Sequence, residues 1–414
     1  MALETARAPT VVATPQLLRF ATAGSVDDGK STLIGRLLYD SKALMADEVG
    51  TAADLARLTD GLRAEREQGI TIDVAYRHFS TPQRRFIIAD TPGHAQYTRN
   101  MVTGASTADV AVVLVDAREG LLTQSRRHAA IAGLLRIPRV VLAVNKMDLV
   151  GYDADAFRSI CADFRAWAAR LQFEEITCIP ISALIGDNVV DPSEAMDWYR
   201  GPTLLQFLET APVAAAPASG PLRLPVQYVI RAGEARAYAG RLAGGRVREG
   251  DEVVVLPSGL TTRVAAVEGP SGPLEAAAAP LSVAVTLEDE VDAGRGALLC
   301  GVDERPRATR DVEATVCWLG ESPGRVGGRY LLKHTTRTER ARLEIVRETL
   351  DVATLSSHPG ADSLGLNDIA RVSLRCASEL VFDPYVENRS TGAFIVIDEG
   401  TNDTVGAGMI ADVR

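Results

Sequence analysis

Residues 24–31, Gly-Ser-Val-Asp-Asp-Gly-Lys-Ser, decide the fold of the first half of the chain. They follow a short apolar run, residues 17–23, and precede residues 32–39, where apolar side chains recur at helical spacing. A glycine-rich turn between a strand and a helix lets backbone N–H groups point at phosphate oxygens, and the helix adds its positive N-terminal end. The stretch therefore predicts a P-loop, with Lys30 on the terminal phosphates and Ser31 on Mg²⁺.

The whole chain has the composition of a soluble protein of two or three domains. Its 414 residues are 46% hydrophobic and 24% charged, with no apolar run long enough to cross a membrane. Residues 1–16 lack the features of a signal peptide, so we expect a loose N-terminal tail and a cytoplasmic location. A net charge of −10 does not favour a nucleic-acid partner. The five scattered cysteines are expected to be buried thiols.

Strand-like and helical segments alternate from residue 17 to about residue 210. The expected strands are residues 17–23, 71–79, 85–90, 109–116, 139–145 and 175–181. This alternation predicts an α/β P-loop domain with a doubly wound, mostly parallel sheet, whose ligands bind at the carboxyl ends of the strands.

A small, Pro-rich stretch, residues 211–222, then marks a linker to a different kind of structure. Short Val-rich runs separated by glycine turns follow, and they predict two β-barrel domains, residues 223–306 and 307–414. The expected strands there include residues 224–230, 238–242, 252–256, 281–287, 312–319, 329–333, 369–374 and 393–398.

Two further motifs follow the predicted strands. Asp90 to His94 reads Asp-Thr-Pro-Gly-His, in which Asp90 can hold Mg²⁺ through water and the Gly93 N–H can approach the γ-phosphate. Asn145 to Asp148 reads Asn-Lys-Met-Asp, and the Asp148 carboxylate can accept hydrogen bonds from guanine N1–H and N2–H₂, which adenine cannot offer. The predicted nucleotide is therefore GTP.

Two smaller features complete the predicted site. Residues 182 and 183, Ser-Ala, can offer a backbone N–H to guanine O6, and Asn145 can tie its loop back to the P-loop. Thr71, at the end of a charged helical insertion covering residues 42–65, is placed on Mg²⁺ and the γ-phosphate. The alternative for Thr71 is an ordinary strand threonine.

Together these motifs resemble those of a translation-factor-type GTPase, and the linker and barrels resemble the three-domain plan of elongation factor Tu. The resemblance implies that His94 orients the attacking water and that Val26 and Ile70 form an apolar gate beside it. It also implies that Asp27 lies near the phosphates and a monovalent cation.

Within that superfamily, residues 25–42, 96–106, 330–337 and 401–409 resemble the large, GTPase subunit of bacterial heterodimeric sulfate adenylyltransferase. The match is looser in the barrels and departs from the family pattern at residues 231–236. It implies GTP hydrolysis coupled to formation of adenylylsulfate and diphosphate by a small, ATP-handling partner subunit. Some members are fused to an adenylylsulfate kinase with its own P-loop; this chain has one P-loop, so that activity is not expected in it.

The residues assigned to the site are as follows. The expected GTP contacts are Gly24, Ser25, Val26, Asp27, Asp28, Gly29, Lys30, Ser31, Thr32, Asp90, Thr91, Pro92, Gly93, His94, Asn145, Lys146, Met147, Asp148, Ser182, Ala183 and Leu184. The expected catalytic residues are Lys30, Thr71, Gly93 and His94, and the expected Mg²⁺ ligands are Ser31, Thr71 and, through water, Asp90.

Two other functions remain open at this level. An elongation-factor-like carrier of aminoacyl-tRNA could use arginines 231, 236, 241, 246 and 248 and the basic segment 333–342 to contact phosphates. The same side chains could equally be solvated strand and turn faces or contacts with a partner subunit. A nucleotide-holding scaffold without turnover is disfavoured, because every residue expected to take part in hydrolysis is present.

Overall fold

The computed structural model describes residues 16–41, 73–93, 98–213, 218–232 and 235–411. The chain divides into two compact units, Met1–Val213 and Ala214–Arg414. This boundary falls inside the segment predicted as a linker, residues 211–222. Ala211 is buried in the core of the first unit and Leu222 in a core of the second. Both ends of the segment are therefore packed.

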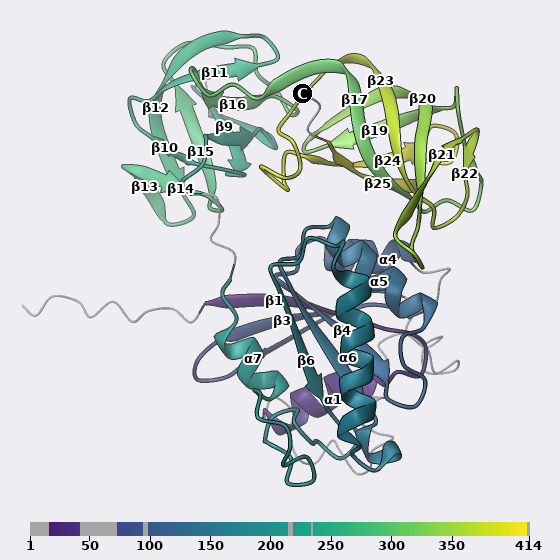
Figure 1. The fold of residues 1–414 in the computed structure, drawn as a ribbon. Coiled ribbons are helices and arrows are strands. Elements are labelled where there is room, and N and C mark those ends of the chain that lie inside the picture. Colours follow the sequence, from purple (N-terminus) through teal and green to yellow (C-terminus); the bar gives the residue numbers. More distant parts are fainter. Residues whose placement is uncertain (1–15, 42–72, 94–97, 214–217, 233–234, 412–414) are drawn as a thin grey trace, which may run out of the picture. The chain divides into compact units, whose positions relative to one another are not determined.

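The first unit is built on a six-stranded sheet in the order β2-β3-β1-β4-β5-β6 (Figure 1). Its strands are β1 (Leu17–Ala23), β2 (Ala75–Ser80), β3 (Arg85–Asp90), β4 (Val110–Asp116), β5 (Arg139–Asn145) and β6 (Glu175–Pro180). Neighbours are parallel except β2 and β3. Every residue of β4 is buried, as expected for a parallel strand covered on both faces. The predicted doubly wound, mostly parallel sheet is confirmed.

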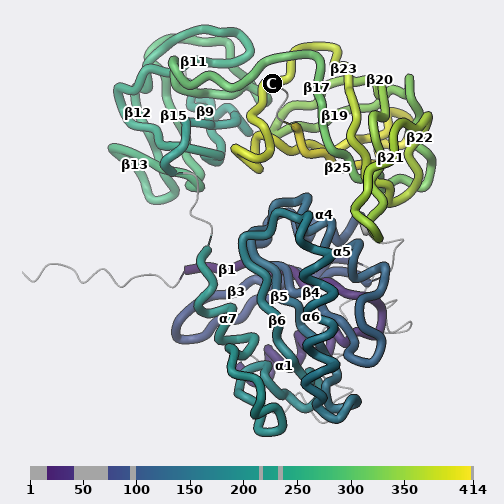
Figure 2. Tube along the Cα trace, viewed as in Figure 1, coloured from purple at the N-terminus to yellow at the C-terminus, as the bar shows by residue number. Residues whose placement is uncertain are grey.

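Helices cover this sheet and connect its strands. They are α1 (Lys30–Asp40), α4 (Thr98–Ala105), α5 (Thr123–Leu134), α6 (Ala154–Ala168) and α7 (Leu204–Thr210). β1 pairs with β3 on one side and with β4 on the other, although both come later in the sequence; the path of the chain can be followed in Figure 2. Because the carboxyl ends of β1, β3, β4, β5 and β6 lie at one edge, the loops that follow them meet there.

The second unit begins with a β-barrel. Its strands are β7 (Arg223–Pro225), β8 (Tyr228–Ala232), β9 (Ala235–Arg241), β10 (Arg246–Arg248), β11 (Glu252–Leu256), β12 (Leu260–Gly269), β13 (Gly272–Leu274), β14 (Ala276–Ala278), β15 (Ser282–Leu287) and β16 (Leu298–Gly301). The main path runs β7-β16-β11-β12-β15-β9-β8. It closes through a bridge between Arg223 and Gly244, which follows β9.

One expected strand of this barrel, residues 224–230, is two strands in the structure. The Val226 N–H donates to Ala297 O, beside β16, whereas the next N–H, of Gln227, donates to Ala239 O in β9. The chain therefore changes partner at this point, which splits the apolar run into β7 and β8. Such a change of partner leaves no mark in hydrophobic periodicity.

The second barrel is closed by hydrogen bonds all the way round. Its strands are β17 (Arg307–Trp318), β18 (Gly324–Arg325), β19 (Arg329–His334), β20 (Arg337–Asp351), β21 (Ser356–Ala361), β22 (Ser363–Leu364), β23 (Ile369–Phe382), β24 (Ala393–Asp398) and β25 (Thr404–Ile410). The order β19-β24-β25-β17-β23-β20 returns to β19 through the β19–β20 pair. Inward-facing apolar residues of these strands form one core. The predicted second barrel is confirmed.

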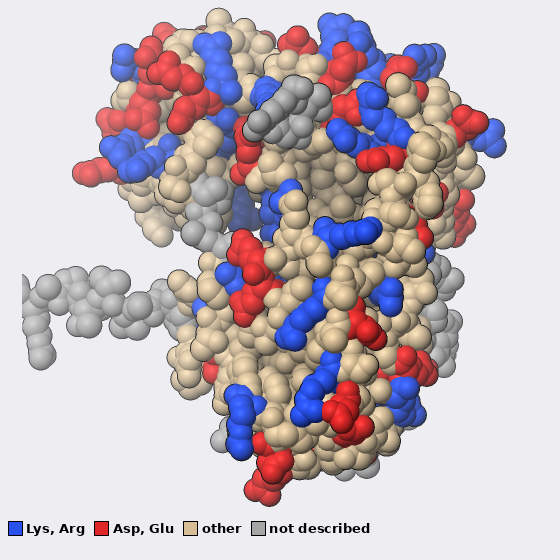
Figure 3. Space-filling model, viewed as in Figure 1, with Lys and Arg blue, Asp and Glu red and all other residues tan. Residues whose placement is uncertain are grey.

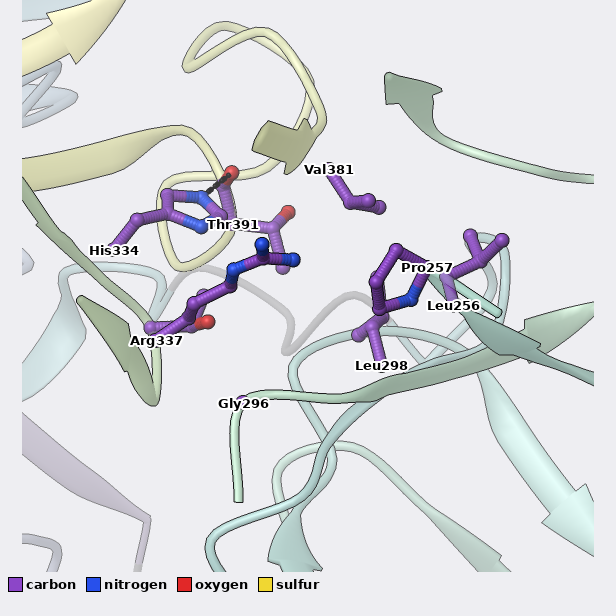
Figure 4. A pocket seen from close by; sticks show the side chains of 9 residues that line it. Leu256, Pro257, Gly296, Leu298, His334, Arg337, Val381 and Thr391 are labelled. Atoms are coloured by element: carbon purple, nitrogen blue, oxygen red, sulfur yellow. Dashed lines mark hydrogen bonds between the residues drawn. The ribbon is translucent and has the colours of Figure 1, made fainter. Parts of the chain in front are cut away.

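A buried polar network joins the two barrels. Arg223 of β7 donates from Nη2 and Nε to the Asp383 carboxylate at 2.8 and 2.9 Å. Thr391 Oγ1 donates to the same carboxylate at 2.6 Å, and His334 Nε2 donates to the Thr391 carbonyl at 2.7 Å. Figure 4 shows His334 and Thr391 across a small cavity from Pro257 and Leu298 of the first barrel. The Arg223 and Asp383 charges in this seam are therefore paired.

We expect Asp383→Asn to lower the free energy of unfolding of the second unit by about 3 kcal/mol, because it leaves the Arg223 guanidinium buried without its counter-charge. Urea unfolding of the full chain, followed by Trp318 fluorescence in a W167F/W198F background, measures this. The control is Asp311→Asn, which breaks the exposed Arg375–Asp311 pair and should cost less than about 1 kcal/mol. Equal losses from the two substitutions would contradict a special role for the seam.

All five cysteines are buried free thiols, as predicted. Within the described part of the chain, no helix is both long enough and apolar enough to span a membrane.

Candidate functional site

The glycine-rich turn after β1 is shaped by two glycines with positive φ, Gly24 at 150° and Gly29 at 92°. A Cβ on Gly29 would lie 2.5 Å from Asn145 Nδ2, so residue 29 must be glycine for the neighbouring loop to approach. The Ser25 N–H donates to Asp28 Oδ2 at 2.5 Å and closes the turn. Burial raises the pKa of Asp28 to about 6, although Lys30 opposes the shift.

Lys30 lies inside this turn. Its Nζ donates to the Gly24 and Ser25 carbonyls at 3.0 and 2.6 Å, and the residue is only 7% exposed. Burial lowers the pKa of Lys30, against the nearby carboxylates of Asp90 and Asp28. A Cβ on Gly93 would lie 2.6 Å from Nζ. The turn after β1 and the segment from Asp90 to Gly93 after β3 are both predicted to contact the terminal phosphate, and they meet at the Lys30 ammonium.

The Asp90 motif is tied to β1. Thr22 Oγ1 donates to Asp90 Oδ1 at 3.1 Å, and Thr91 Oγ1 donates to the Thr22 carbonyl at 2.5 Å. Asp90, Thr91, Pro92 and Gly93 are all buried. The Asp90 carboxylate is thus held beside Lys30 at the carboxyl edge of the sheet. His94, Thr71 and Ile70 lie outside the described residues.

Asn145 joins the turn after β1 to the loop after β6. Its Nδ2 donates to the Asp28 carbonyl at 2.7 Å, and its Oδ1 accepts from the Ala183 N–H at 2.9 Å. The predicted tie from Asn145 to the P-loop is therefore present. One buried amide fixes the distance between the two loops expected to hold phosphate and base.

The loops that follow β5 and β6 present Asp148 and Lys146. Asp148 Oδ1 accepts from Ser182 Oγ at 2.7 Å, and Lys146 Nζ lies 2.9 Å from Asp116 Oδ2. Burial opposes the shift, but hydrogen bonds from Arg118 and Lys146 hold the pKa of Asp116 below its usual range. The Leu184 side chain is half exposed beside them. The loops after β5 and β6 therefore carry the Asp148 carboxylate, the Lys146 side chain and the exposed Leu184 side chain.

The other predicted contact residues differ in exposure. Val26 and Asp27 are exposed, and Ser31 and Thr32 are half-buried on the first turn of α1. Met147 is fully buried, and its N–H donates to the Ile181 carbonyl at 3.2 Å. The Met147 side chain is therefore a core residue, and it is a structural member of its motif.

Sequence reasoning missed His128 of α5, because it assigned a chemical role to His94 alone. The Gly24 N–H donates to His128 Nδ1 at 3.0 Å, and His128 Nε2 lies 2.9 Å from the side-chain amide of Gln124. Burial, reinforced by the charges of Lys30 and Arg127, lowers the pKa of His128 to about 3. The ring is thus neutral, and because Nδ1 accepts from the Gly24 N–H, the ring proton is on Nε2 and the Gln124 side chain must turn its amide oxygen toward it. Nothing in the local sequence places α5 against the turn.

Asp116 was also missed, although it ends β4 as Asp90 ends β3, so its position at the sheet edge was a signal that could have been used.

We expect His128→Leu to weaken GTP binding about tenfold, because the buried Gly24 N–H then has no acceptor. His128→Asn has nearly the same shape as the leucine variant and offers Oδ1 where Nδ1 stood, so it should retain most of the affinity. Titration calorimetry on both variants with Mg²⁺ measures this. Equal losses in the two variants would show that volume, and not the hydrogen bond, matters.

Comparison with known proteins agrees with this arrangement. The family described as "Elongation factor Tu GTP binding domain" matches residues 15–212, and the family "GTP-eEF1A C-terminal domain-like" matches residues 311–411. The "Bifunctional enzyme CysN/CysC" of Mycobacterium tuberculosis (strain ATCC 25618 / H37Rv) is 56% identical over 411 residues, which cover 95% of this chain and 67% of that protein.

Two relatives of more similar length are each named "Sulfate adenylyltransferase subunit 1". The protein of Bacteroides fragilis (strain YCH46) is 50% identical over 410 residues, or 96% of this chain and 86% of the relative. The protein of Aeromonas salmonicida (strain A449) is 49% identical over 413 residues, with 96% and 87% covered. The chain therefore belongs to the sulfate adenylyltransferase subunit 1 family, whose first domain is of the elongation factor Tu GTP-binding type.

Proposed function

We propose that the chain is the GTP-hydrolysing subunit of a sulfate adenylyltransferase, and that it couples GTP hydrolysis to formation of adenylylsulfate and diphosphate from ATP and sulfate. The observation that carries this proposal is about 50% identity to proteins named sulfate adenylyltransferase subunit 1 across both units of the chain. The sulfate–phosphate anhydride is uphill to form, which gives a second nucleotide hydrolysis a physical purpose.

The described residues fit GTP and Mg²⁺. Gly24, Gly29 and Gly93 carry no side chain where a Cβ would collide with Lys30, Asn145 or the backbone, and such glycines let the backbone of a turn approach phosphate oxygens closely. Ser31 would bind Mg²⁺ directly and the buried Asp90 carboxylate through water, with Thr71 as a further ligand. Bound Mg²⁺ would neutralise charge on the β- and γ-phosphates.

The residues of the chain then have distinct roles. Lys30 stabilises the charge that develops between the β- and γ-phosphates, from a position fixed by two carbonyls. The Gly93 N–H binds the γ-phosphate, and His94, by resemblance to the family, orients the attacking water. Asp148 accepts from guanine N1–H and N2–H₂, while the backbone near Ala183 donates to O6.

The partner in this proposal is a small subunit that handles ATP and sulfate in a heterodimer or higher assembly. The relatives' name, subunit 1, implies that a second subunit exists. Loss of the γ-phosphate would release the segments that contain Thr71 and His94, and such a release can turn bond cleavage into movement. A cytoplasmic location and a monovalent cation near Asp27 belong to the same proposal.

Delivery of aminoacyl-tRNA is less well supported. Three arginines of the basic segment 333–342 face carboxylates: Arg337 pairs with Glu339, Arg340 with Glu399 and Arg342 with Glu344. On the face drawn in Figure 3, basic and acidic side chains are interspersed. Paired arginines attract a phosphate backbone weakly, so this segment offers little to RNA.

The decisive experiment measures GTP hydrolysis and adenylylsulfate formation together, with and without the suspected partner. Alone, the chain should turn over slowly, on the order of 10⁻⁴ to 10⁻² s⁻¹, because the water and the transition-state charge are incompletely positioned. Partner, ATP and sulfate together should raise this rate, and adenylylsulfate yield should rise with GTP. A hydrolysis rate that does not change when partner, ATP and sulfate are added would overturn the coupling. Binding of aminoacyl-tRNA in a filter assay would instead support the tRNA-carrier function.

A further inference from the structure

Arg36 of α1 contacts the loop that follows β6. Its Nη2 donates to the Leu184 carbonyl at 2.6 Å, and its Nε donates to the Ala183 carbonyl at 3.4 Å. Its Nη1 lies 3.4 Å from Asp40 Oδ1, one helical turn further along α1. Each nitrogen of the planar guanidinium therefore has an acceptor, and the group is held between helix and loop.

The packing around Arg36 fixes this contact. Gly186 has φ of 106°, and a Cβ there would meet Arg36 Cδ and Asp40 Oδ2 at 3.6 Å. Burial raises the pKa of Asp40, and the Arg36 charge opposes the shift. The Arg36 side chain is only 18% exposed. The Arg36 side chain is thus mostly buried, although its Nη2 bond to the Leu184 carbonyl lies at the surface.

The loop is held from two sides. Asn145 Oδ1 accepts from the Ala183 N–H, and Asp148 accepts from Ser182 Oγ, both on the side of β5. Arg36 holds the carbonyls of Ala183 and Leu184 from the side of α1. Because α1 begins with Lys30, the residues that bind the triphosphate and the support of this loop belong to one short helix.

We propose that Arg36 is a positioning residue for guanine: it holds the Ala183–Leu184 backbone where the N–H groups of this loop meet guanine O6. The inference rests on the proposed function, since it takes the base to lie in this loop. Arg36 itself touches no part of the nucleotide. Without the Arg36 guanidinium, the Ala183 and Leu184 carbonyls lose a charged donor, and the N–H groups of this loop move away from guanine O6. The turn after β1, which binds the phosphates, keeps its own contacts.

The test compares GTP with 2-aminopurine riboside triphosphate, which lacks O6 and the N1 proton but keeps the 2-amino group, in titrations of the full chain with Mg²⁺. Arg36→Met should weaken GTP binding about tenfold and the analogue less than about twofold. Arg36→Lys keeps the charge and stem but not the fork, and it should weaken GTP selectively to a smaller extent. The control is Arg158→Met, which removes an exposed arginine paired with Asp155 and should change neither affinity.

Each other outcome overturns the inference. Unchanged GTP affinity in Arg36→Met shows that the loop needs no support from α1. Equal weakening of both nucleotides shows general loosening of the domain, and leaves the proposed function intact. A wild-type chain that binds the analogue as tightly as GTP overturns the base site of the proposed function as well. If Arg36→Met does not fold, Arg36→Lys decides by the same comparison.

Discussion

Lys30→Ala should reduce GTP hydrolysis by about a thousandfold or more, and with it the GTP-dependent part of adenylylsulfate formation. The Lys30 ammonium is buried, supported by the carbonyls of Gly24 and Ser25, and adjacent to Gly93. A cation held so rigidly needs no reorganisation when charge develops on the transferring phosphate. Single-turnover hydrolysis by the chain assembled with its partner measures the loss.

Two controls separate this effect from damage to the fold. Lys333→Ala removes an exposed lysine of β19 and should leave hydrolysis unchanged. Assembly of Lys30→Ala with the partner, followed by sedimentation, should match wild type, because Lys30 lies inside the nucleotide turn. Retained coupling in a folded, assembled Lys30→Ala variant would contradict the assignment of this turn to the triphosphate.

Asp148→Asn should change the base preference of the chain from guanine to xanthine. Asp148 can accept two hydrogen bonds from guanine, and an amide in its place offers a donor to the xanthine carbonyl at C2 while losing the charge. Two charge-assisted bonds of about 1.5–3 kcal/mol each imply at least a hundredfold loss of GTP affinity. Competition between GTP and xanthosine triphosphate measures the exchange.

The matched control for this exchange is Asp155→Asn, an exposed carboxylate at the start of α6. It should leave both affinities unchanged. The Ser182 hydroxyl, which donates to Asp148 Oδ1 in the wild type, can still donate to the amide oxygen of the variant, so the loop should keep its shape. GTP affinity that survives Asp148→Asn would remove the assignment of the base pocket to this loop.

The central strands of the first unit could be predicted closely because they are buried on both faces. A strand such as β5 is a continuous apolar run bounded by polar residues, and its observed limits are the predicted ones. The edge strand β2, Ala75–Ser80, was predicted at residues 71–79, and its burial alternates along the strand. The barrels were harder to predict. β20 carries charged residues on its outward face and only a few buried ones, so Arg337–Asp351 does not stand out as a strand. Strands of two or three residues, such as β18 and β13, have no periodicity to detect.

The residues of the candidate site also differ in how well they could be predicted from the sequence. Residues of the loop motifs could be assigned from sequence because each motif consists of residues that lie within a few positions of one another. The supports of those loops could not be assigned, because His128 and Arg36 act across the fold, on residues 104 and 148 positions away. Their roles depend on which helix packs against which loop, and that is decided by the sheet.

The seam between the barrels has a mechanical consequence. Arg223 and Asp383 are buried together, and parting them would expose two charges that are now paired within the protein. We therefore expect the two barrels to move together. A partner that binds the outer surface of one barrel would then move both, so contact with a single barrel would be enough to move the whole second unit.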